Sequence, residues 1–225
     1  MPVYQRERRF IAGVRMGAAP PNPAVLVLAA GFSSRLGRPK ALARVRGVSL
    51  LRRTLLVISG SCAARIIVVL PRAAARLRIE GRGFRALFAV NERRAEGLSS
   101  SVRRGILRAR YSPAVLLVPV DLAALQRRDV IRLMSRWRGT RRRVIARRLG
   151  ERAGSAQGGA PLILPRWLYP RALAVSGDVG LRKLVSELPA AQRVLLNLSS
   201  AALDVDTPQD LRVARDRMHR SRITP

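Results

Sequence analysis

The sequence predicts an α/β protein, a three-layer α/β/α Rossmann-like arrangement around a mostly parallel sheet. Three observations support this prediction. Short apolar runs alternate with segments of helical spacing for most of the 225 residues. The first run, residues 24–29 (AVLVLA), is apolar throughout, which is typical of a strand buried on both faces. Polar loops follow two of these runs directly, at the strand ends where open parallel sheets bind ligands.

The segment ahead of this pattern differs in composition. Residues 1–23 are charged at first and then carry three prolines. We therefore predict an N-terminal extension, within which Met16 is a candidate start, followed by a single domain over residues 24–225. No apolar run approaches the roughly 20 residues that span a bilayer, and the apolar stretch at 10–14 is too short for a signal peptide. We expect a cytoplasmic protein without membrane contacts.

The predicted strands are short apolar runs bounded by polar or turn-forming residues. After residues 24–29, they cover residues 65–70, 84–90, 114–120, 143–147, 161–164 and 193–198. The strand at 65–70 (RIIVVL) ends at Pro71, and the strand at 114–120 (AVLLVPV) is followed at once by Asp121.

The predicted helices lie between these strands, where apolar residues recur at helical spacing. They cover residues 50–59, 97–109, 128–137, 178–188 and 207–218. In the helix at 97–109, Val102 and Ile106 fall on one side. Pro208 suits the first turn of the last helix, because that position needs no backbone N–H donor.

Composition limits the chemistry that the chain can perform. It has one cysteine, Cys62, which excludes an internal disulfide and a cysteine-built metal site. Its one histidine, His219, leaves no convincing Ser-His-Asp arrangement or zinc ligand set. Any catalysis must therefore use carboxylates, a hard metal ion, backbone amides and cationic side chains.

The net charge of +31 allows two interpretations. A basic surface can bind nucleic acid or anionic membranes. However, only two of the 44 basic residues are lysines, Lys40 and Lys183, although either residue type neutralises a phosphate. This bias favours arginine-rich codon usage over selection for polyanion binding, and nonspecific affinity for nucleic acid is expected to accompany it.

The loop at residues 28–42 (LAAGFSSRLGRPKAL) follows the first strand and predicts a polyphosphate site. Its small residues permit close approach of phosphate to backbone N–H groups, and its hydroxyls and cations add donors and charge. These residues are Ala29, Ala30, Gly31, Ser33, Ser34, Arg35 and Lys40. The spacing fits neither a P-loop nor a GxGxxG dinucleotide loop. We predict that the loop binds a nucleoside triphosphate.

This loop resembles the signature of the nucleotidyltransferases related to the molybdenum cofactor cytidylyl- and guanylyltransferases. Other motifs of that family follow in order over most of the chain. They are NERRAEGLSSSVRRGI (91–106), VPVD (118–121), GGAPLIL (158–164), SGDVGLRKLV (176–185) and LDVDTPQDL (203–211). The resemblance implies a fold like that of the nucleotide-diphospho-sugar transferases. Pro39, which replaces the acidic residue typical of guanylyl enzymes, and the GGAP and GDxG elements favour the cytidylyl group.

The resemblance implies a role for each motif. Arg35 and Lys40 would act in catalysis. The nucleotide would contact Leu28, Ala29, Ala30, Gly31, Ser34, Asn91 and Gly97. The acceptor side would include Gly159, Pro161 and Asp178. Two of these have alternatives, because Asn91 can simply end a strand and Asp178 can cap the following helix.

Mg²⁺ is the expected cofactor, because hard cations take carboxylate and phosphate oxygens. Asp121 is the first expected ligand, since an aspartate at the tip of a buried strand has few structural reasons to lie there; capping the next helix is the alternative. The resemblance favours Asp204 as the second ligand. Asp206 competes with Asp204 for this role, or caps the helix that begins near Thr207.

The segment around Asp121 departs from the family pattern G-D-x-P. Val120 and Ala123 stand where the family commonly has glycine and proline. The valine adds bulk beside the triphosphate, and the loop after Asp121 lacks a rigid turn. We expect reduced activity or an altered substrate.

The implied reaction transfers CMP from CTP to the terminal phosphate of molybdopterin with release of pyrophosphate, and a molybdoenzyme would receive the product. A guanylyltransferase or a sugar-phosphate nucleotidyltransferase of the same fold is the first alternative. A basic nucleic-acid-binding module is an alternative of another class, although 4 % aromatic residues disfavour base stacking. An inactive relative that delivers cofactor to an apoenzyme is a further one.

Overall fold

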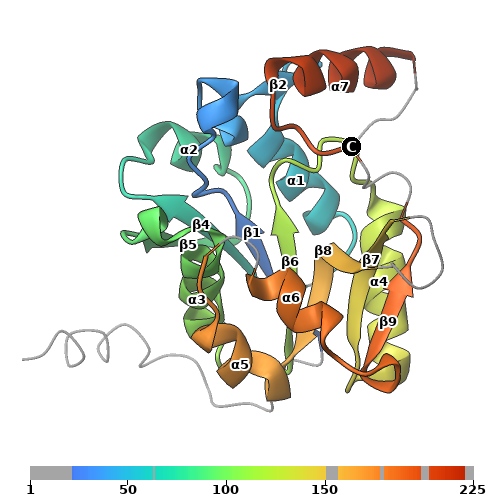
Figure 1. Ribbon diagram of the computed structural model, residues 1–225. Coiled ribbons are helices and arrows are strands. Elements are labelled where there is room, and N and C mark those ends of the chain that lie inside the picture. Colours follow the sequence, from blue (N-terminus) through green and yellow to red (C-terminus); the bar gives the residue numbers. More distant parts are fainter. Residues whose placement is uncertain (1–21, 63, 151–156, 178–179, 199–202, 221–225) are drawn as a thin grey trace, which may run out of the picture.

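A seven-stranded sheet lies between two layers of helices in the computed structural model (Figure 1). The structure describes residues 22–62, 64–150, 157–177, 180–198 and 203–220. The sheet strands are β1 (Ala24–Leu28), β4 (Ile66–Pro71), β5 (Ala86–Asn91), β6 (Ala114–Pro119), β7 (Val144–Leu149), β8 (Gln157–Pro165) and β9 (Arg193–Leu196). Two short strands, β2 (Arg44–Val45) and β3 (Val48–Ser49), form a separate ribbon.

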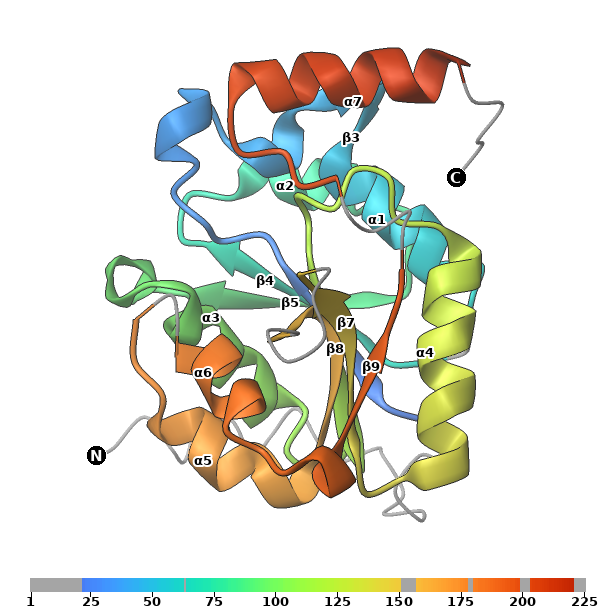
Figure 2. The same cartoon turned by 45° about the vertical axis from the view of Figure 1, so that its right-hand side comes forward.

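The α-helices are α1 (Leu50–Ser59), α2 (Ala75–Glu80), α3 (Leu98–Arg108), α4 (Arg127–Thr140), α5 (Tyr169–Ala174), α6 (Gly180–Ser186) and α7 (Pro208–Arg220). Helices α1 and α4 cover one face of the sheet, whereas α3, α5 and α6 cover the other (Figure 2). Helix α7 and the β2–β3 ribbon lie across the end of the sheet toward which β6 points (Figure 1).

The strand order explains where a site can form. The sheet runs β5-β4-β1-β6-β8-β7-β9, and β8 is the strand that pairs antiparallel with its neighbours. From β1 the chain first builds outward to β4 and β5, and it then returns to place β6 on the other side of β1. The order reverses there, and such a switch point leaves a crevice at the carboxyl ends of the strands.

Alternation along β1 divides the core between the two faces. Val25 and Val27 pack with residues of α1 and α4, including Leu55 and Leu133. Leu26 and Leu28 pack with residues of α3, α5 and α6 on the opposite face. A third group of buried residues joins α7 to the β2–β3 ribbon and the start of α1. This α7 cluster consists of Leu36, Ala43, Val45, Leu50, Ala123, Val205, Leu211, Ala214 and Met218.

The structure confirms the predicted α/β/α class and differs at several elements. Strand β8 begins at Gln157 instead of 161, and α6 is described from Gly180 because residues 178–179 lie outside the described part. The prediction for residues 1–21 also falls outside it. Helices α2 and α5 and the β2–β3 ribbon were not predicted, because elements of two to six residues show too little periodicity to be recognised.

Candidate active site

The loop that leaves β1 meets the tip of β6. Leu28 is in register with Pro119, and the backbone N–H of Val120 donates to the carbonyl of Leu28 at 3.3 Å. The loop then makes two short 3₁₀ turns, at Ser34–Leu36 and Lys40–Leu42. This arrangement places Lys40 and Asp121 at the same edge of the sheet, as the sequence predicted.

The side chain of Ser33 closes the loop. Ser33 has a left-handed backbone conformation (φ 57°), and its Oγ accepts a hydrogen bond of 2.9 Å from the backbone N–H of Lys40. The loop therefore folds back on itself, and the lysine leaves it from a fixed position. The sequence identified Ser33 only as a donor to phosphate, whereas here it acts within the loop.

The Lys40 amine lies between two carboxylates. Its Nζ donates to Asp121 Oδ2 at 3.4 Å and also to Asp206 Oδ1. Burial alone would lower the pKa of Lys40, but the hydrogen bond to Asp206 and the charges of Asp206 and Asp121 raise the pKa above its usual value. Lys40 is therefore a permanent cation at neutral pH.

Asp121 is the most confined carboxylate of this cluster. Its side chain keeps 25 % of its surface exposed. Burial raises the pKa of Asp121, the Lys40 charge lowers it, and the charges of Asp204 and Asp206 raise it again. Crowded carboxylates of this kind are stabilised by a nearby cation.

A short pairing brings the segment before α7 to Asp121. Leu122 forms an antiparallel bridge with Asp204, and the N–H of Val205 donates to the carbonyl of Asp121 at 2.9 Å. Residues 203–206 therefore run beside the loop that follows β6. This pairing joins parts of the chain that are about 80 residues apart in sequence, and it delivers Asp206 to Lys40.

Asp206 is free for this role because other residues cap α7. The carboxylate of Asp210 accepts from the backbone N–H groups of Asp206 and Thr207 and from Thr207 Oγ1. The N–H of Asp210 in turn donates to Thr207 Oγ1 at 3.2 Å, which completes a reciprocal cap. The T-P-Q-D spacing was the sequence signal that could have assigned the cap to Thr207 and Asp210.

Asp204, the residue favoured by the sequence, has a different partner. Its two carboxylate oxygens face Arg147, at 3.4 Å from Nη1 and 3.5 Å from Nη2. Burial raises the pKa of Asp204, and the Arg147 charge opposes this effect. The sequence did not indicate Arg147, because one buried arginine is not distinguishable from the many exposed ones.

A cleft of about 900 Å³ opens beside this cluster. The loop after β1 lines it with Leu28, Ala29 and Gly31, and the cluster of Lys40 and its carboxylates lines it with Lys40 and Asp121. Ala30 is buried in the core, whereas Ser34 and Arg35 are exposed and lie outside the described lining. The structure therefore brings together only part of the predicted loop residues at the cleft.

The lining of the cleft also includes several cations. Arg72, Arg76 and Arg94 line it. The Arg94 guanidinium lies 4.1 Å from the centre of the Phe32 ring, and Phe32 also lines the cleft. A hollow bounded by backbone amides, a lysine and several arginines suits a polyphosphate ligand.

Asn91 and Gly97 shape the connection from β5 to α3. Asn91 Nδ2 donates to Ser100 Oγ at 2.8 Å and to Ser101 Oγ at 3.0 Å, and its Oδ1 accepts from the N–H of Arg93. Gly97 has φ 84° and ψ −173°, a conformation that is essentially restricted to glycine. Both residues lie outside the described cleft lining, which this connection reaches through neighbouring side chains.

Two of the predicted acceptor-side residues, Gly159 and Pro161, lie in β8 and are not part of the described cleft lining. Gly159 is paired with Arg147, and a Cβ at this glycine would approach Leu149 Cδ1 to 2.4 Å. Pro161 is buried and follows a cis peptide bond. Asp178 lies outside the described residues. The positions of Gly159 and Pro161 are accounted for by strand packing next to the Arg147–Asp204 pair.

The two departures at the Asp121 segment are both buried. Val120 lines the cleft and packs in the core against the α1–α4 face. Ala123 belongs to the α7 cluster, and its carbonyl accepts a hydrogen bond of 2.9 Å from Arg53 Nε. The loop after Asp121 is thus held by a side chain from α1.

The described residues lack two further features. They contain no group of three or more His, Cys, Asp or Glu side chains placed to hold a metal ion by themselves. None of their helices combines the length and the apolar character that crossing a membrane requires.

Comparison with known proteins agrees with this architecture. Residues 25–194 match the family model described as "MobA-like NTP transferase domain". No curated protein sequence is significantly similar to the chain.

Several solved structures share the fold. Rv0371c from Mycobacterium tuberculosis H37Rv is 24 % identical, with a TM-score of 0.69 over 86 % of this chain and 98 % of that one. Its complex with manganese gives 22 % identity and a TM-score of 0.66, over 87 % and 98 % of the two chains. A nucleotidyl transferase from Methanothermobacter is 20 % identical, with a TM-score of 0.72 over 88 % and 98 %. Molybdopterin-guanine dinucleotide biosynthesis protein A from Archaeoglobus fulgidus is 13 % identical, with a TM-score of 0.65 over 88 % and 100 %.

Proposed function

Because the chain belongs to the family of MobA-like NTP transferase domains and is a nucleotidyltransferase, we propose that it transfers CMP from CTP to molybdopterin. The terminal phosphate of molybdopterin attacks the α-phosphorus of CTP, and pyrophosphate leaves. One observation carries the proposal: the Lys40 amine lies between Asp121 and Asp206 beside a cationic cleft. The cytoplasm is the setting that we propose for this reaction.

The donor set around Lys40 fits a hard divalent cation. Asp121 and Asp206 each direct a carboxylate oxygen toward one positive charge. Mg²⁺ is typically held by one or two carboxylates together with substrate phosphates and water. A site with two carboxylates therefore suits a cation that arrives with the triphosphate, and the related fold of Rv0371c has been solved with manganese. We assign Asp121 and Asp206 as the protein ligands, with Asp204 as the alternative that the resemblance favours.

The protein's contribution is binding and charge neutralisation. A phosphate nucleophile is already anionic, so no strong general base is needed. Backbone amides of the loop after β1 hold the phosphates, and Lys40 opposes the negative charge that gathers on the departing pyrophosphate. Bound Mg²⁺ supplies further neutralisation of the triphosphate. Arg35 is exposed, and its contact with the phosphates stays a prediction.

The choice of base and acceptor rests on the sequence motifs. Pro39 and the GGAP and GDxG elements support the cytidylyl assignment. The similarity of fold to protein A of molybdopterin-guanine dinucleotide biosynthesis supports a molybdopterin acceptor and keeps GTP as an alternative. A sugar phosphate is the alternative acceptor, and a molybdoenzyme is the proposed recipient of the product.

A thermal-shift titration tests the proposal, followed by an assay of pyrophosphate release. CTP with Mg²⁺ at a hundredfold excess over its dissociation constant is expected to raise the Tm by about 5–10 °C. GTP and ATP should raise it less. Pyrophosphate release with CTP should depend on molybdopterin and not on sugar phosphates.

Two variants serve as site and control. Asp121→Asn removes a carboxylate that burial disfavours, so it should stay folded and lose the Mg²⁺-dependent part of the shift. Asp216→Asn changes the same charge at an exposed position of α7 and should behave as wild type. If no triphosphate changes the Tm, the proposal is contradicted. If GTP raises the Tm more than CTP does, GTP is the substrate in place of CTP.

A further inference from the structure

A buried arginine on α1 has no role in the cluster described so far. The Arg53 side chain is almost completely enclosed, with 3 % of the residue exposed. Its Nε donates to the carbonyl of Ala123 at 2.9 Å. Within the described part of the chain, its Nη2 is buried and has no hydrogen-bond partner. A buried charge with an unmet donor lowers stability, so a compensating role has to be sought.

Arg53 lies near buried apolar residues and near the charge of Arg46. It lies three residues after Leu50, on the side of α1 that faces the α7 cluster, to which Ala123 also belongs. Burial, and next the charge of Arg46, lowers the pKa of Arg53. An aliphatic side chain would fill this space without the cost of desolvating a charge. What such a side chain would not provide is a donor to the Ala123 carbonyl.

The hydrogen bond from Arg53 completes the support of the turn after Asp121. On one side, the Asp121 carbonyl accepts from the N–H groups of Ala123 at 2.8 Å and Val205 at 2.9 Å. Leu125 closes the turn by donating to Leu122 at 3.1 Å. These bonds tie the turn to itself and to the segment before α7. Among the hydrogen bonds of the described residues, the one from Arg53 connects the turn to α1, a ten-residue helix packed in the core.

We infer that Arg53 is a positioning residue of the metal site: through the Ala123 carbonyl it fixes the turn that aims Asp121. This inference rests on the proposed function, because the orientation of the Asp121 side chain matters only if Asp121 binds the metal ion. Arg53 does not line the cleft and acts through the backbone of the turn. A buried hydrogen bond of this kind is strengthened by the low local dielectric, which suits it to holding one geometry.

Hydrogen exchange in the ligand-free protein tests the structural half of the inference. Arg53→Met keeps most of the length and removes the donor. It is expected to accelerate exchange of the Ala123 and Leu125 amides by about tenfold, a shift typical when a supporting partner is removed. Arg52→Met is the matched control, because Arg52 donates to the carbonyls of Glu80 and Arg82 on the other side of α1. It should leave these two amides unchanged.

The Mg²⁺ requirement tests the functional half. In pyrophosphate release from CTP, Arg53→Met should raise the Mg²⁺ concentration for half-maximal rate by about tenfold or more. The Tm without ligands should stay the same or rise, since an incompletely paired charge has left the interior. Arg53→Lys keeps a donor and should lie between wild type and Arg53→Met in both measurements. If Arg53→Met does not fold, amide exchange and the Mg²⁺ requirement are measured on Arg53→Lys instead.

The outcomes separate this inference from the proposed function. A folded variant with wild-type exchange at Ala123 and Leu125 would overturn the role of Arg53. So would a changed exchange rate with an unchanged Mg²⁺ requirement. If the wild-type protein shows no Mg²⁺-dependent reaction, the proposed function fails, and the exchange data still decide whether Arg53 holds the turn.

Discussion

Asp206 and Asp204 differ by two positions and have opposite environments. Asp206 shares the Lys40 amine with Asp121, whereas Asp204 faces the Arg147 guanidinium. Both carboxylates stay about half exposed, at 44 % and 48 % of their side-chain surface. Asp204 and Asp206 therefore do not differ in exposure. They differ in the identity of the cationic partner. On the proposed function, two carboxylates that meet at an amine beside the cleft suit a metal ion better than a carboxylate paired with the buried guanidinium of Arg147.

This difference predicts unequal effects of two matched substitutions. Asp206→Asn should lower kcat/KM for pyrophosphate release by about a hundredfold, because it removes a proposed metal ligand at the charged centre. Asp204→Asn should lower it by about tenfold, the lower end of the range expected of a residue that supports the site from outside. Steady-state kinetics at saturating Mg²⁺ measures both. If Asp204→Asn lowers kcat/KM more than Asp206→Asn does, Asp204 is the second metal ligand.

At the residue scale, the sequence predicted the site only in part. Lys40 and Asp121 could be found because lysine is rare in this chain and because Asp121 directly follows an apolar strand. The sequence left Asp206 in competition with Asp204, because an aspartate before a helix often caps it; in the structure Thr207 and Asp210 form the cap. Arg53 was not predicted, since nothing in its sequence neighbourhood distinguishes a buried arginine from an exposed one.

The connection from β5 to α3 shows how an element boundary supports the cleft. Gly97 begins α3 in a backbone conformation that side chains disfavour, and Asn91 ties the end of β5 to two serines in the first turn of the helix. The connection then turns Arg94 and Leu98 toward the cleft. The motif at residues 91–106, which resembles a nucleotide-binding segment, therefore has a structural role in shaping this connection.

Two glycine substitutions separate backbone strain from the loss of a flexible residue. Gly97→Ala should destabilise the fold by about 1–3 kcal/mol, because alanine is strained at φ 84° and ψ −173°. For a chain of this size each kcal/mol lowers the Tm by about 2–4 °C. Gly139→Ala is the control, since it lies inside α4 with open space around the added Cβ and should stabilise the helix by up to about 1 kcal/mol.

Calorimetry of the two variants measures these changes. If the Gly97→Ala protein is as stable as wild type, the connection can change its conformation without loss of stability. The cleft lining would then not depend on the backbone conformation of Gly97. If Gly97→Ala lowers the stability and Gly139→Ala raises it, the destabilisation at Gly97 is caused by its backbone angles.

At the element scale, the strands and longer helices were predictable because their apolar periodicity is strong. The direction of β8 was not, since the run at 161–164 has the same composition in either direction. Its earlier start at Gln157 lies in the G-G-A segment, where small residues give no strand signal. Gly158 and Gly159 are needed there because a Cβ on either would collide with neighbouring side chains, a tertiary requirement that local sequence does not reveal.

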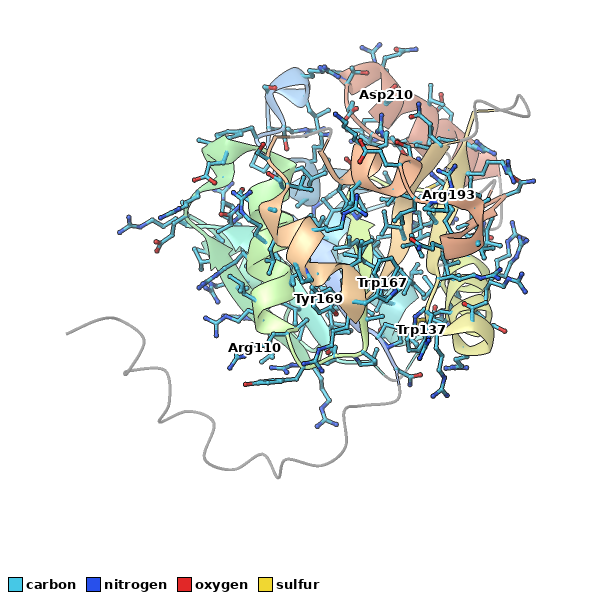
Figure 3. All side chains as sticks on the ribbon, turned by 60° about the horizontal axis from the view of Figure 1, so that its bottom comes forward. Arg110, Trp137, Trp167, Tyr169, Arg193 and Asp210 are labelled. Carbon is cyan, nitrogen blue, oxygen red and sulfur yellow. The ribbon has the colours of Figure 1, made fainter. Side chains whose placement is uncertain are left out.

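The excess of positive charge is distributed over the whole molecule. Nitrogen-tipped side chains project around the entire outline in Figure 3. Asp210, at the start of α7, is one of few acidic groups, with 13 in the chain against 44 basic residues. The basic residues are also spread along the whole sequence and are not gathered in one element. This distribution agrees with the interpretation that codon usage, and not a selected binding surface, produced the net charge of +31.

This interpretation predicts weak binding to nucleic acid with a steep salt dependence. Random-sequence duplex DNA should bind at 50 mM salt and lose about 10³-fold or more in affinity by 200 mM, as counterion release requires. Fluorescence anisotropy over this salt range measures the loss. CTP with Mg²⁺ should not compete for the bound DNA. Tight binding that persists at 200 mM salt would instead indicate a dedicated nucleic-acid surface.

The bridge between Leu122 and Asp204 has a consequence for biosynthesis of the protein. Translation delivers β1, β6 and Asp121 long before it delivers Asp206, so a nascent chain can assemble most of its sheet while its catalytic cluster still lacks a carboxylate. Chains cut short before residue 203 lack that carboxylate altogether. On the proposed function, proteolytic clipping between β9 and residue 203 would remove a metal ligand without removing a strand of the central sheet.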